Sequence, residues 1–307
     1  MRRDSHTSGS RAAPEQPIGG DSGRWELLRA LGAVCLQPPP ASDQLCDALG
    51  IARWQRAEHT GVFVLDLSPH SSIYLGAEGG IGGIAAETAA GIWRTLGLKP
   101  PGDADHIGTL LALYAHLGES AGSCQTEAAE KRLEHARQVL LWEHLWSWVP
   151  FYLEALTGQP ESPAAARQWA AVLSSALDQE ARWSEPPQVL PSVLRDAPPP
   201  LGEDPSVDDL VKSVATPVSS GFILTFSDLT RCAAAAGVGL RRGERRFALR
   251  AMLEQDPAST LSWLSSHARR WEDWFSARAE AKHPGELIFE WWAQRAGHTA
   301  RNLRSLL

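Results

Sequence analysis

Apolar residues recur at helical spacing along most of the chain. The clearest case is the segment 105–119, whose apolar residues are Ile107, Leu110, Leu111, Tyr114 and Leu117. Intervals of three and four positions put such residues on one face of a helix. The same period continues over 126–156, where Pro150 predicts a kink. Further helices are predicted over 24–36, 42–55, 84–96, 163–183, 225–236, 245–254, 258–278 and 284–307. The pattern therefore predicts an all-α fold.

Three stretches interrupt the helical pattern. The segment 62–67 has β-propensity, but no partner strand is in view, so an extended connection is expected there. The run GAEGGIGG from Gly76 to Gly83 reads as a tight turn before a helix. The segment 184–217 is rich in proline and acidic residues with little periodicity, which indicates a linker or a loosely draped loop.

These breaks predict four parts of the chain. Residues 1–23 are expected to be a disordered tail, and 24–183 a single helical bundle. The Pro/acid-rich linker 184–217 then leads to a helical extension, 218–307, that packs on the first domain.

Charge and cysteine content narrow the function classes. The net charge of −7 argues against general nucleic-acid binding, which shows as a basic excess, and is compatible with a basic peptide partner. The four cysteines lack CxxC spacing and are expected to be free thiols in a reducing compartment. No run approaches the ~20 apolar residues of a membrane span, and the N-terminus lacks an export signal, so a cytoplasmic protein without membrane insertion is expected.

Recognisable catalytic motifs are absent from the sequence. Neither an HExxH zinc motif nor a GxSxG nucleophile elbow occurs. We therefore expect no enzyme, no metal and no cofactor. An alternative stays open, in which a nucleotide- or cofactor-binding enzyme uses the turn from Gly76 to Gly83 and a basic cluster as a phosphate site. That cluster, a candidate anion contact, consists of Arg241, Arg242, Arg245 and Arg246.

Two places in apolar helices hold candidate binding residues. Asp105 is placed to cap the helix over 105–119, which leaves the neighbouring His106 either to pack or to face a cleft. His144 and Trp148 lie four residues apart, hence on one helical face among other aromatic residues. Such crowding suits core packing, and it also suits a groove that accepts an apolar peptide.

Several segments together resemble the TorD/DmsD/NarJ family of molybdoenzyme-maturation chaperones. They are 68–80 (SPHSSIYLGAEGG), 86–119 and 140–156 (LLWEHLWSWVPFYLEAL). The central motif is Asp105-His106-Ile107-Gly108, and the later one is His144-Leu145-x-x-Trp148. The Glu-Pro pair that often precedes the central motif is replaced by Gly102-Asp103. The similarity covers roughly residues 25–180.

The resemblance implies an all-α bundle of the TorD type that binds its client without covalent chemistry. The client would be the apo catalytic subunit of a molybdopterin oxidoreductase, together with its twin-arginine signal peptide, held until cofactor insertion and export or assembly. The motif places Asp105 and His106 on or beside the peptide-binding surface. We extend this expected surface to His144, Trp148, Tyr74 and Tyr114. The motifs do not identify the client, and a monomer or a homodimer is compatible with the sequence.

Overall fold

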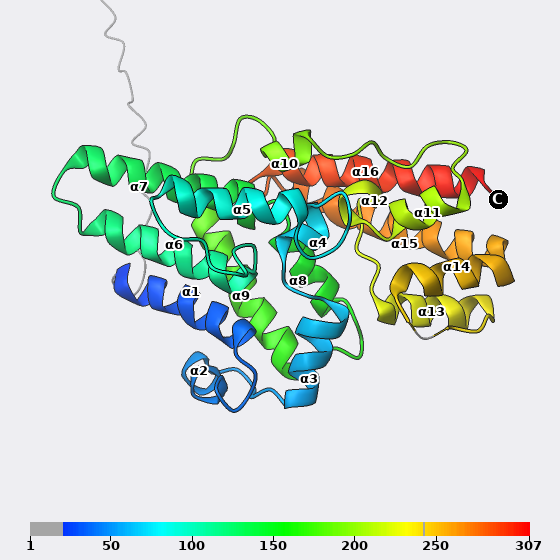
Figure 1. Ribbon diagram of the computed structural model, residues 1–307, viewed down its shortest axis with the longest axis horizontal. Coiled ribbons are helices and arrows are strands. Elements are labelled where there is room, and N and C mark those ends of the chain that lie inside the picture. The colour runs from blue at the N-terminus through cyan, green and yellow to red at the C-terminus, as the bar shows by residue number, and fades with distance from the viewer. Residues whose placement is uncertain (1–20, 242) are drawn as a thin grey trace, which may run out of the picture.

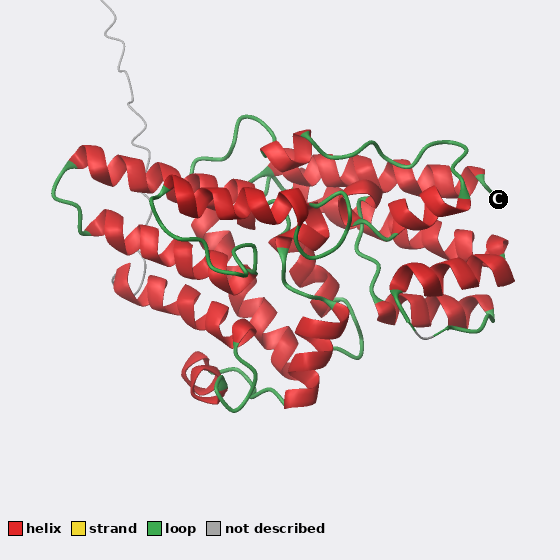
Figure 2. Cartoon of the chain, viewed as in Figure 1, coloured by secondary structure: helices red, strands yellow, loops and turns green. Residues whose placement is uncertain are grey.

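The described part of the computed structural model, residues 21–241 and 243–307, consists of helices joined by loops (Figure 2). It contains no β-strand, and its isolated β-bridge pairs His70 with His106. The prediction of an all-α fold is confirmed. The expected tail, 1–23, falls mostly outside the described residues, and α1 already begins at Asp21.

The first part of the chain forms the larger group of helices. They are α1 (Asp21–Leu36), α2 (Asp43–Leu49), α3 (Arg56–Thr60), η1 (Gly61–Asp66), α4 (Ser71–Leu75), α5 (Gly83–Thr95), α6 (Ile107–Gly122), α7 (Glu127–Val139), η2 (Leu140–Leu145), α8 (Val149–Thr157) and α9 (Ala164–Trp183). In Figure 1, α1, α6 and α7 lie at one end of the molecule, and α9 runs through its centre.

The remaining helices run from the middle of the molecule, where α10 lies, to its other end (Figure 1). They are α10 (Ser192–Arg195), α11 (Val207–Val214), α12 (Pro217–Ser220), α13 (Phe226–Ala236), α14 (Arg245–Gln255), α15 (Pro257–Glu280) and α16 (Glu286–Ser305). The long helices α15 and α16 pack side by side along much of their length. No helix within the described ranges combines the length and apolar character that a bilayer crossing requires.

Glycines allow α1 and α6 to approach closely. A Cβ atom on Gly108 would lie 2.5 Å from the carbonyl oxygen of Gly32, and one on Gly118 would lie 2.3 Å from the ring of Trp25. Such distances are sterically impossible without movement, so these positions admit no larger residue while the two helices keep their spacing.

Aromatic packing joins the two ends of the molecule. The ring of Phe151, in α8, lies with its centroid 4.5 Å from that of Trp292 and 5.9 Å from that of Phe275. One hydrophobic cluster accordingly extends from Trp25 in α1 to Leu303 in α16. The 218–307 segment thus packs on the helices that precede it.

The segment 62–67 is helical, contrary to the extended connection predicted for it. Residues Gly61–Asp66 form the π-helix η1 directly after α3. Phe63 explains the difference, because burying its ring among Trp54, His59 and Trp169 fixes the segment against the bundle. Tertiary packing has overridden the local β-propensity.

The helical run predicted over 126–156 is interrupted before Pro150 rather than kinked at it. The chain passes from α7 into η2, turns at 146–148 and starts again as α8, with Pro150 in the first turn. Proline is tolerated there because the N–H groups of a first turn have no partner within the helix.

The Pro/acid-rich segment 184–217 is tied to the core and contains two short helices, α10 and α11. Leu194 and Leu201 are 1% and 3% exposed. The Leu201 carbonyl accepts hydrogen bonds from the side chains of His298 and Asn302 at 2.9 and 2.8 Å. The segment is therefore more ordered than the predicted loosely draped loop.

Candidate functional site

The residues before α4 and at the start of α6 form a junction of backbone hydrogen bonds. Next to the bridge between His70 and His106, the N–H of Ile107 donates to the carbonyl of Pro69 at 2.8 Å. The two histidine rings meet edge to face with centroids 4.9 Å apart. The junction joins the first two segments that carry the resemblance, 68–80 and 86–119.

Asp105 serves a different helix from the one predicted. Its Oδ2 accepts from the N–H of Ser72 at 3.0 Å, and its carbonyl accepts from Ser71 N–H at 3.0 Å, so Asp105 completes the N-terminus of α4. The N-cap of α6 is His106 instead, whose Nδ1 accepts from Gly108 N–H at 3.0 Å. The prediction that Asp105 caps α6 is therefore wrong by one position. The backbone turn at 103–106 directs the Asp105 side chain to α4 instead of to α6.

His106 is held in the neutral state. Burial lowers its pKa to about 4, and the neighbouring His70 contributes in the same direction. A neutral imidazole has one nitrogen free to accept a hydrogen bond, as Nδ1 does here.

Tyr74 and Trp148 pack against the chain that leads from η1 to α4. Their rings stack with centroids 5.0 Å apart, and the Tyr74 hydroxyl donates to Ser68 O at 2.8 Å. The hydroxyl of Tyr152 donates to the adjacent carbonyl, that of Leu67, at 3.0 Å. Buried aromatic side chains therefore fix residues 67–68, immediately after η1.

Tyr114 and His144 lie in the interior away from this segment. Tyr114 donates to Glu180 Oε2 at 2.7 Å and belongs to a charged network with Arg137. His144 is 8% exposed, and burial lowers its pKa to about 4. Its carbonyl accepts from Trp148 Nε1 at 2.7 Å.

All six predicted peptide-binding side chains are buried. Their exposed fractions range from 0% for Trp148 and Tyr114 to 8% for His144. Direct contact of these side chains with a peptide stays a prediction. Their packing gives Tyr74, Trp148, Asp105 and His106 a positioning role around residues 67–72.

The arginine cluster binds to neighbouring backbone. Arg245 donates from Nη1 to Leu224 O at 2.8 Å, and Arg246 donates to the carbonyl of Glu78 in the glycine-rich turn. The guanidinium of Arg241 lies over the Phe247 ring at 5.9 Å. Arg242 lies outside the described residues. The turn and the cluster do meet, through Arg246, and the anion contact itself stays a prediction.

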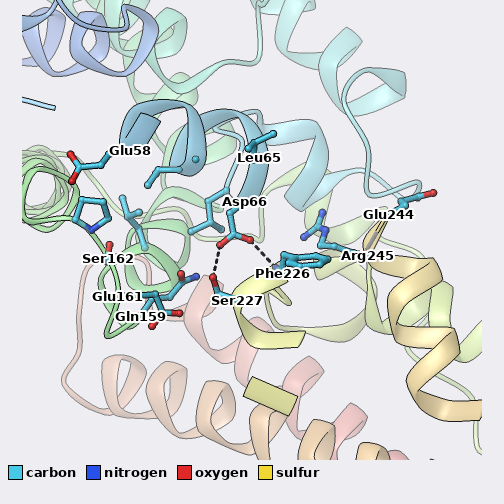
Figure 3. Close-up of a pocket in the computed structure, with 16 residues that line it drawn as sticks. Glu58, Leu65, Asp66, Gln159, Glu161, Ser162, Phe226, Ser227, Glu244 and Arg245 are labelled. Atoms are coloured by element: carbon cyan, nitrogen blue, oxygen red, sulfur yellow. Dashed lines mark hydrogen bonds between the residues drawn. The ribbon is translucent and has the colours of Figure 1, made fainter. Parts of the chain in front are cut away.

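A cleft of about 580 Å³ opens beside the fixed segment (Figure 3). It has three sides, which we name the π-helix wall, the loop wall and the extension wall. The π-helix wall consists of Glu58, Gly61, Val62, Leu65, Asp66 and Leu67. The loop wall, between α8 and α9, consists of Leu156, Gln159, Glu161, Ser162 and Pro163. The extension wall consists of Phe226, Ser227, Gly243, Glu244 and Arg245.

The cleft combines apolar surface with an excess of negative charge. The described lining residues include four carboxylates, those of Glu58, Asp66, Glu161 and Glu244, and one guanidinium, that of Arg245. Leu65 extends the apolar surface outward, since its side chain is 77% exposed. Such a site suits a ligand with an apolar part and positive charge.

Asp66 joins the π-helix wall to the extension wall. Its Oδ1 accepts from the N–H of Phe226 at 2.7 Å, and its Oδ2 accepts from the Ser227 hydroxyl at 3.2 Å (Figure 3). Burial raises the pKa of Asp66, while these two hydrogen bonds act against the increase. The bundle and the extension, joined by these bonds, therefore line the cleft together.

Comparison with known families identifies the central part of the chain. Residues 40–153 match the family model described as nitrate reductase delta subunit. This segment is similar to the nitrate reductase delta subunit family. The match confirms the resemblance to the NarJ and TorD type of chaperone. No curated protein and no solved structure gives a significant match.

The delta-subunit segment contains the junction and one side of the cleft. It runs from α2 into α8 and includes the whole π-helix wall, whereas the loop and extension walls lie outside it. The family is one of chaperones rather than of catalysts, which supports a general role in molybdoenzyme maturation. The described residues contain no group of His, Cys, Asp and Glu suited to hold a metal ion.

Sequence reasoning missed the cleft residues of the delta-subunit segment and of the extension. Glu58 and Glu244 are 186 positions apart, and neither lies in a recognisable motif. The one local sign was the apolar pair Val64 and Leu65 after a short polar helix, which the structure leaves exposed beside the cleft. The acidic side chains come together around one cavity only in the folded chain, where Phe226 and Ser227 at the start of α13 bond to Asp66 of η1.

Proposed function

We propose that this protein is a cytoplasmic maturation chaperone that binds the apo catalytic subunit of a molybdopterin oxidoreductase, including its twin-arginine signal peptide. The cleft beside η1 would take the peptide. The bound subunit would be held until its cofactor is inserted and export or assembly follows. The observation that carries this proposal is the acidic, apolar-walled cleft built partly from the delta-subunit segment.

The cleft offers what a basic and apolar peptide needs. Its carboxylates would form charge-assisted hydrogen bonds with guanidinium groups. The side chains of Val62, Leu65, Leu156 and Phe226 would cover an apolar stretch that follows the arginines. Because a flexible peptide loses entropy when it binds, the expected affinity is moderate, which permits release to the next partner.

The buried motif residues would act on the peptide through the wall that they position. Asp105 and His106 fix the start of α4 and α6, and Tyr74, stacked on Trp148, fixes the carbonyl of Ser68. These contacts hold the residues that follow η1. A change in this support would therefore alter the π-helix wall without removing a group that touches the peptide.

The nucleotide-binding alternative has less support from the geometry. A phosphate site at the turn from Gly76 to Gly83 needs free cationic groups, but Arg246 already donates to the Glu78 carbonyl of that turn. Arg245 donates to Leu224 O. The proposed chaperone needs no bound cofactor of its own.

Titration with a labelled peptide tests the proposal. A twin-arginine peptide with its apolar stretch is titrated with the full chain and followed by fluorescence anisotropy, beside a peptide in which both arginines are glutamine. We expect the arginine peptide to bind at least about tenfold more tightly, and the difference to shrink at high salt. Equal affinities for the two peptides would refute this site.

A further inference from the structure

A second cleft, of about 190 Å³, is lined by residues of α8, α13 and α15, and we name it the α15 cleft. The helix α15 contributes His267, Arg270, Trp271 and Trp274 to it. Residues spaced by three, four and seven positions lie on one side of a helix, so these side chains face the cleft together. The cleft suits a ligand of a few non-hydrogen atoms, since a water molecule in the liquid takes up about 30 Å³.

Three groups compete for the two nitrogens of the buried His267 ring. The carbonyl oxygen of Ile223 lies 2.9 Å from Nε2, and the indole Nε1–H of Trp271 points to the same nitrogen at 3.2 Å. The Nη2 atom of Arg270 lies 2.6 Å from Nδ1. A carbonyl oxygen only accepts hydrogen bonds, whereas a guanidinium and an indole only donate them. The ring therefore meets one acceptor and two donors.

A neutral imidazole cannot satisfy all three groups, because it has one N–H and one accepting nitrogen. Burial lowers the pKa of His267 despite the nearby carboxylate of Asp228, so the ring is neutral. Its Nδ1 accepts from Arg270, and its Nε2–H donates to the Ile223 carbonyl. The indole N–H of Trp271 is then left without an acceptor among the described residues, although this side chain is only 8% exposed. A buried donor without an acceptor carries a desolvation cost that a bound acceptor would relieve.

The guanidinium of Arg270 adds positive charge next to this indole N–H. Within the described residues it pairs with no carboxylate, and its printed hydrogen bond goes to the histidine ring. The other charged groups of the cleft have opposite charges beside them. Arg231 donates to Asp228 at 2.6 Å. Burial lowers the pKa of Arg278, and the nearby carboxylate of Glu154 acts against that decrease. The charge of Arg270 is therefore the one in the α15 cleft that a ligand can neutralise.

A carboxylate fits these two groups, because one oxygen can accept from the guanidinium and the other from the indole N–H. We infer that the α15 cleft binds a small carboxylate, held by Arg270 and Trp271, with the ring of Trp274 covering its apolar side. The rings of Trp271 and Trp274 meet edge to face with centroids 5.7 Å apart, which leaves them on adjoining sides of the cleft. The inference goes beyond the proposed function and does not depend on it, since none of these three side chains lines the cleft beside η1.

Two sources offer this chemistry, a free small carboxylate and an aspartate or glutamate side chain of a bound protein. The indole N–H signal of Trp271 in proton–nitrogen NMR spectra of the full chain reports on the site directly. It is identified as the indole signal missing from Trp271→Phe. The wild-type chain is titrated at constant ionic strength with acetate and with acetamide, which has the same shape without the charge. Further titrations use a terminally blocked Ala-Ala-Glu-Ala-Ala peptide and its glutamine counterpart.

We expect acetate to move the Trp271 signal downfield until it saturates, and acetamide to need a concentration at least about tenfold higher. Arg270→Gln should weaken acetate binding about tenfold. Arg269→Gln, which changes the exposed neighbour outside the cleft, is the matched control and should leave the affinity unchanged.

The two sources separate in the same titrations. A glutamate peptide that binds more tightly than acetate identifies a protein side chain as the ligand, and one that binds no more tightly identifies a free carboxylate. A Trp271 signal that neither acetate nor the glutamate peptide moves would overturn the site. Equal responses to acetate and acetamide, or an undiminished affinity in Arg270→Gln, would overturn it as well.

Discussion

The carboxylate of Asp105 accepts a hydrogen bond from the backbone N–H of Ser72, with Oδ2 and N 3.0 Å apart. The two residues are 33 positions apart and lie in two different motifs that carry the resemblance to the chaperone family. Through this bond, the Asp-His motif at the start of α6 sets the position of α4, and with it the chain that leaves η1. The motif thus positions a wall of the cleft without lining it.

Replacing Asp105 should destabilise the protein. Asp105→Ala leaves the N–H of Ser72 without a partner in a buried place, which costs about 1–3 kcal/mol of unfolding free energy. Asp105→Asn keeps an acceptor oxygen and should lose less. Urea unfolding followed by circular dichroism measures both, and an alanine variant as stable as the wild type would show that this bond has no structural weight.

The glycine of the same motif should resist enlargement. Gly108→Ala forces a Cβ atom to 2.5 Å from the Gly32 carbonyl oxygen, so α1 and α6 must separate, at a cost of about 1–3 kcal/mol. Gly91→Ala is the matched control, because a Cβ there meets nothing within 4 Å inside α5. It should raise stability by up to about 1 kcal/mol. Thermal melting of both variants checks the contrast, which a stable Gly108→Ala protein would contradict.

The packing of the segment 184–217 can be tested at one leucine. Leu194 is 1% exposed, so Leu194→Ala should lower the unfolding free energy by about 2–5 kcal/mol. Val189→Ala, five residues earlier, removes a side chain that is 64% exposed and should change stability by less than about 0.5 kcal/mol. Denaturant titration compares the two. Similar small effects would mean that the segment is a loosely attached linker after all.

Buried neutral histidines should make the fold sensitive to acid. Burial lowers the pKa of His144 from 6.5 to about 4 in the folded protein. As the pH falls below 6.5, the unfolded chain binds a proton at His144 that the folded chain does not bind. The contribution of neutral His144 to the unfolding free energy is therefore full above pH 6.5 and is lost as the pH falls from 6.5 to about 4. The shift corresponds to about 3 kcal/mol for this residue.

His144→Leu removes that proton and should flatten the pH dependence of the unfolding free energy between pH 7 and 5. His116→Gln, which changes an exposed histidine of α6, should leave the dependence as in the wild type. Unfolding titrations at pH 7, 6 and 5 provide the measurement. An unchanged slope in His144→Leu would contradict the assignment of His144 as a neutral buried group.

Helical periodicity was sufficient to predict most of the elements. The spacing of Ile107, Leu110 and Tyr114 predicted α6, whose buried face carries these residues. The π-helix at Gly61–Asp66 could not be predicted in this way, because Val62 and Val64 favour strands locally and only the burial of Phe63 fixes a helix. Local preference was overruled by distant partners.

The candidate site depends even more on distant partners. The motif around Asp105 indicated the correct region of the molecule, but its hydrogen-bond partner, Ser72, lies in another segment. The cleft carboxylates Glu58 and Glu244 lie on different walls, and no sequence spacing relates one to the other. Their positions in the sequence give no sign that these two residues line one cavity.

Affinity capture of the full-length protein from its source cells tests the chaperone role most directly, with captured proteins identified by mass spectrometry. The account predicts recovery of a molybdopterin oxidoreductase catalytic subunit, at a level that falls when Glu58 and Glu244 are both changed to glutamine. A clean capture without any such subunit would contradict the account.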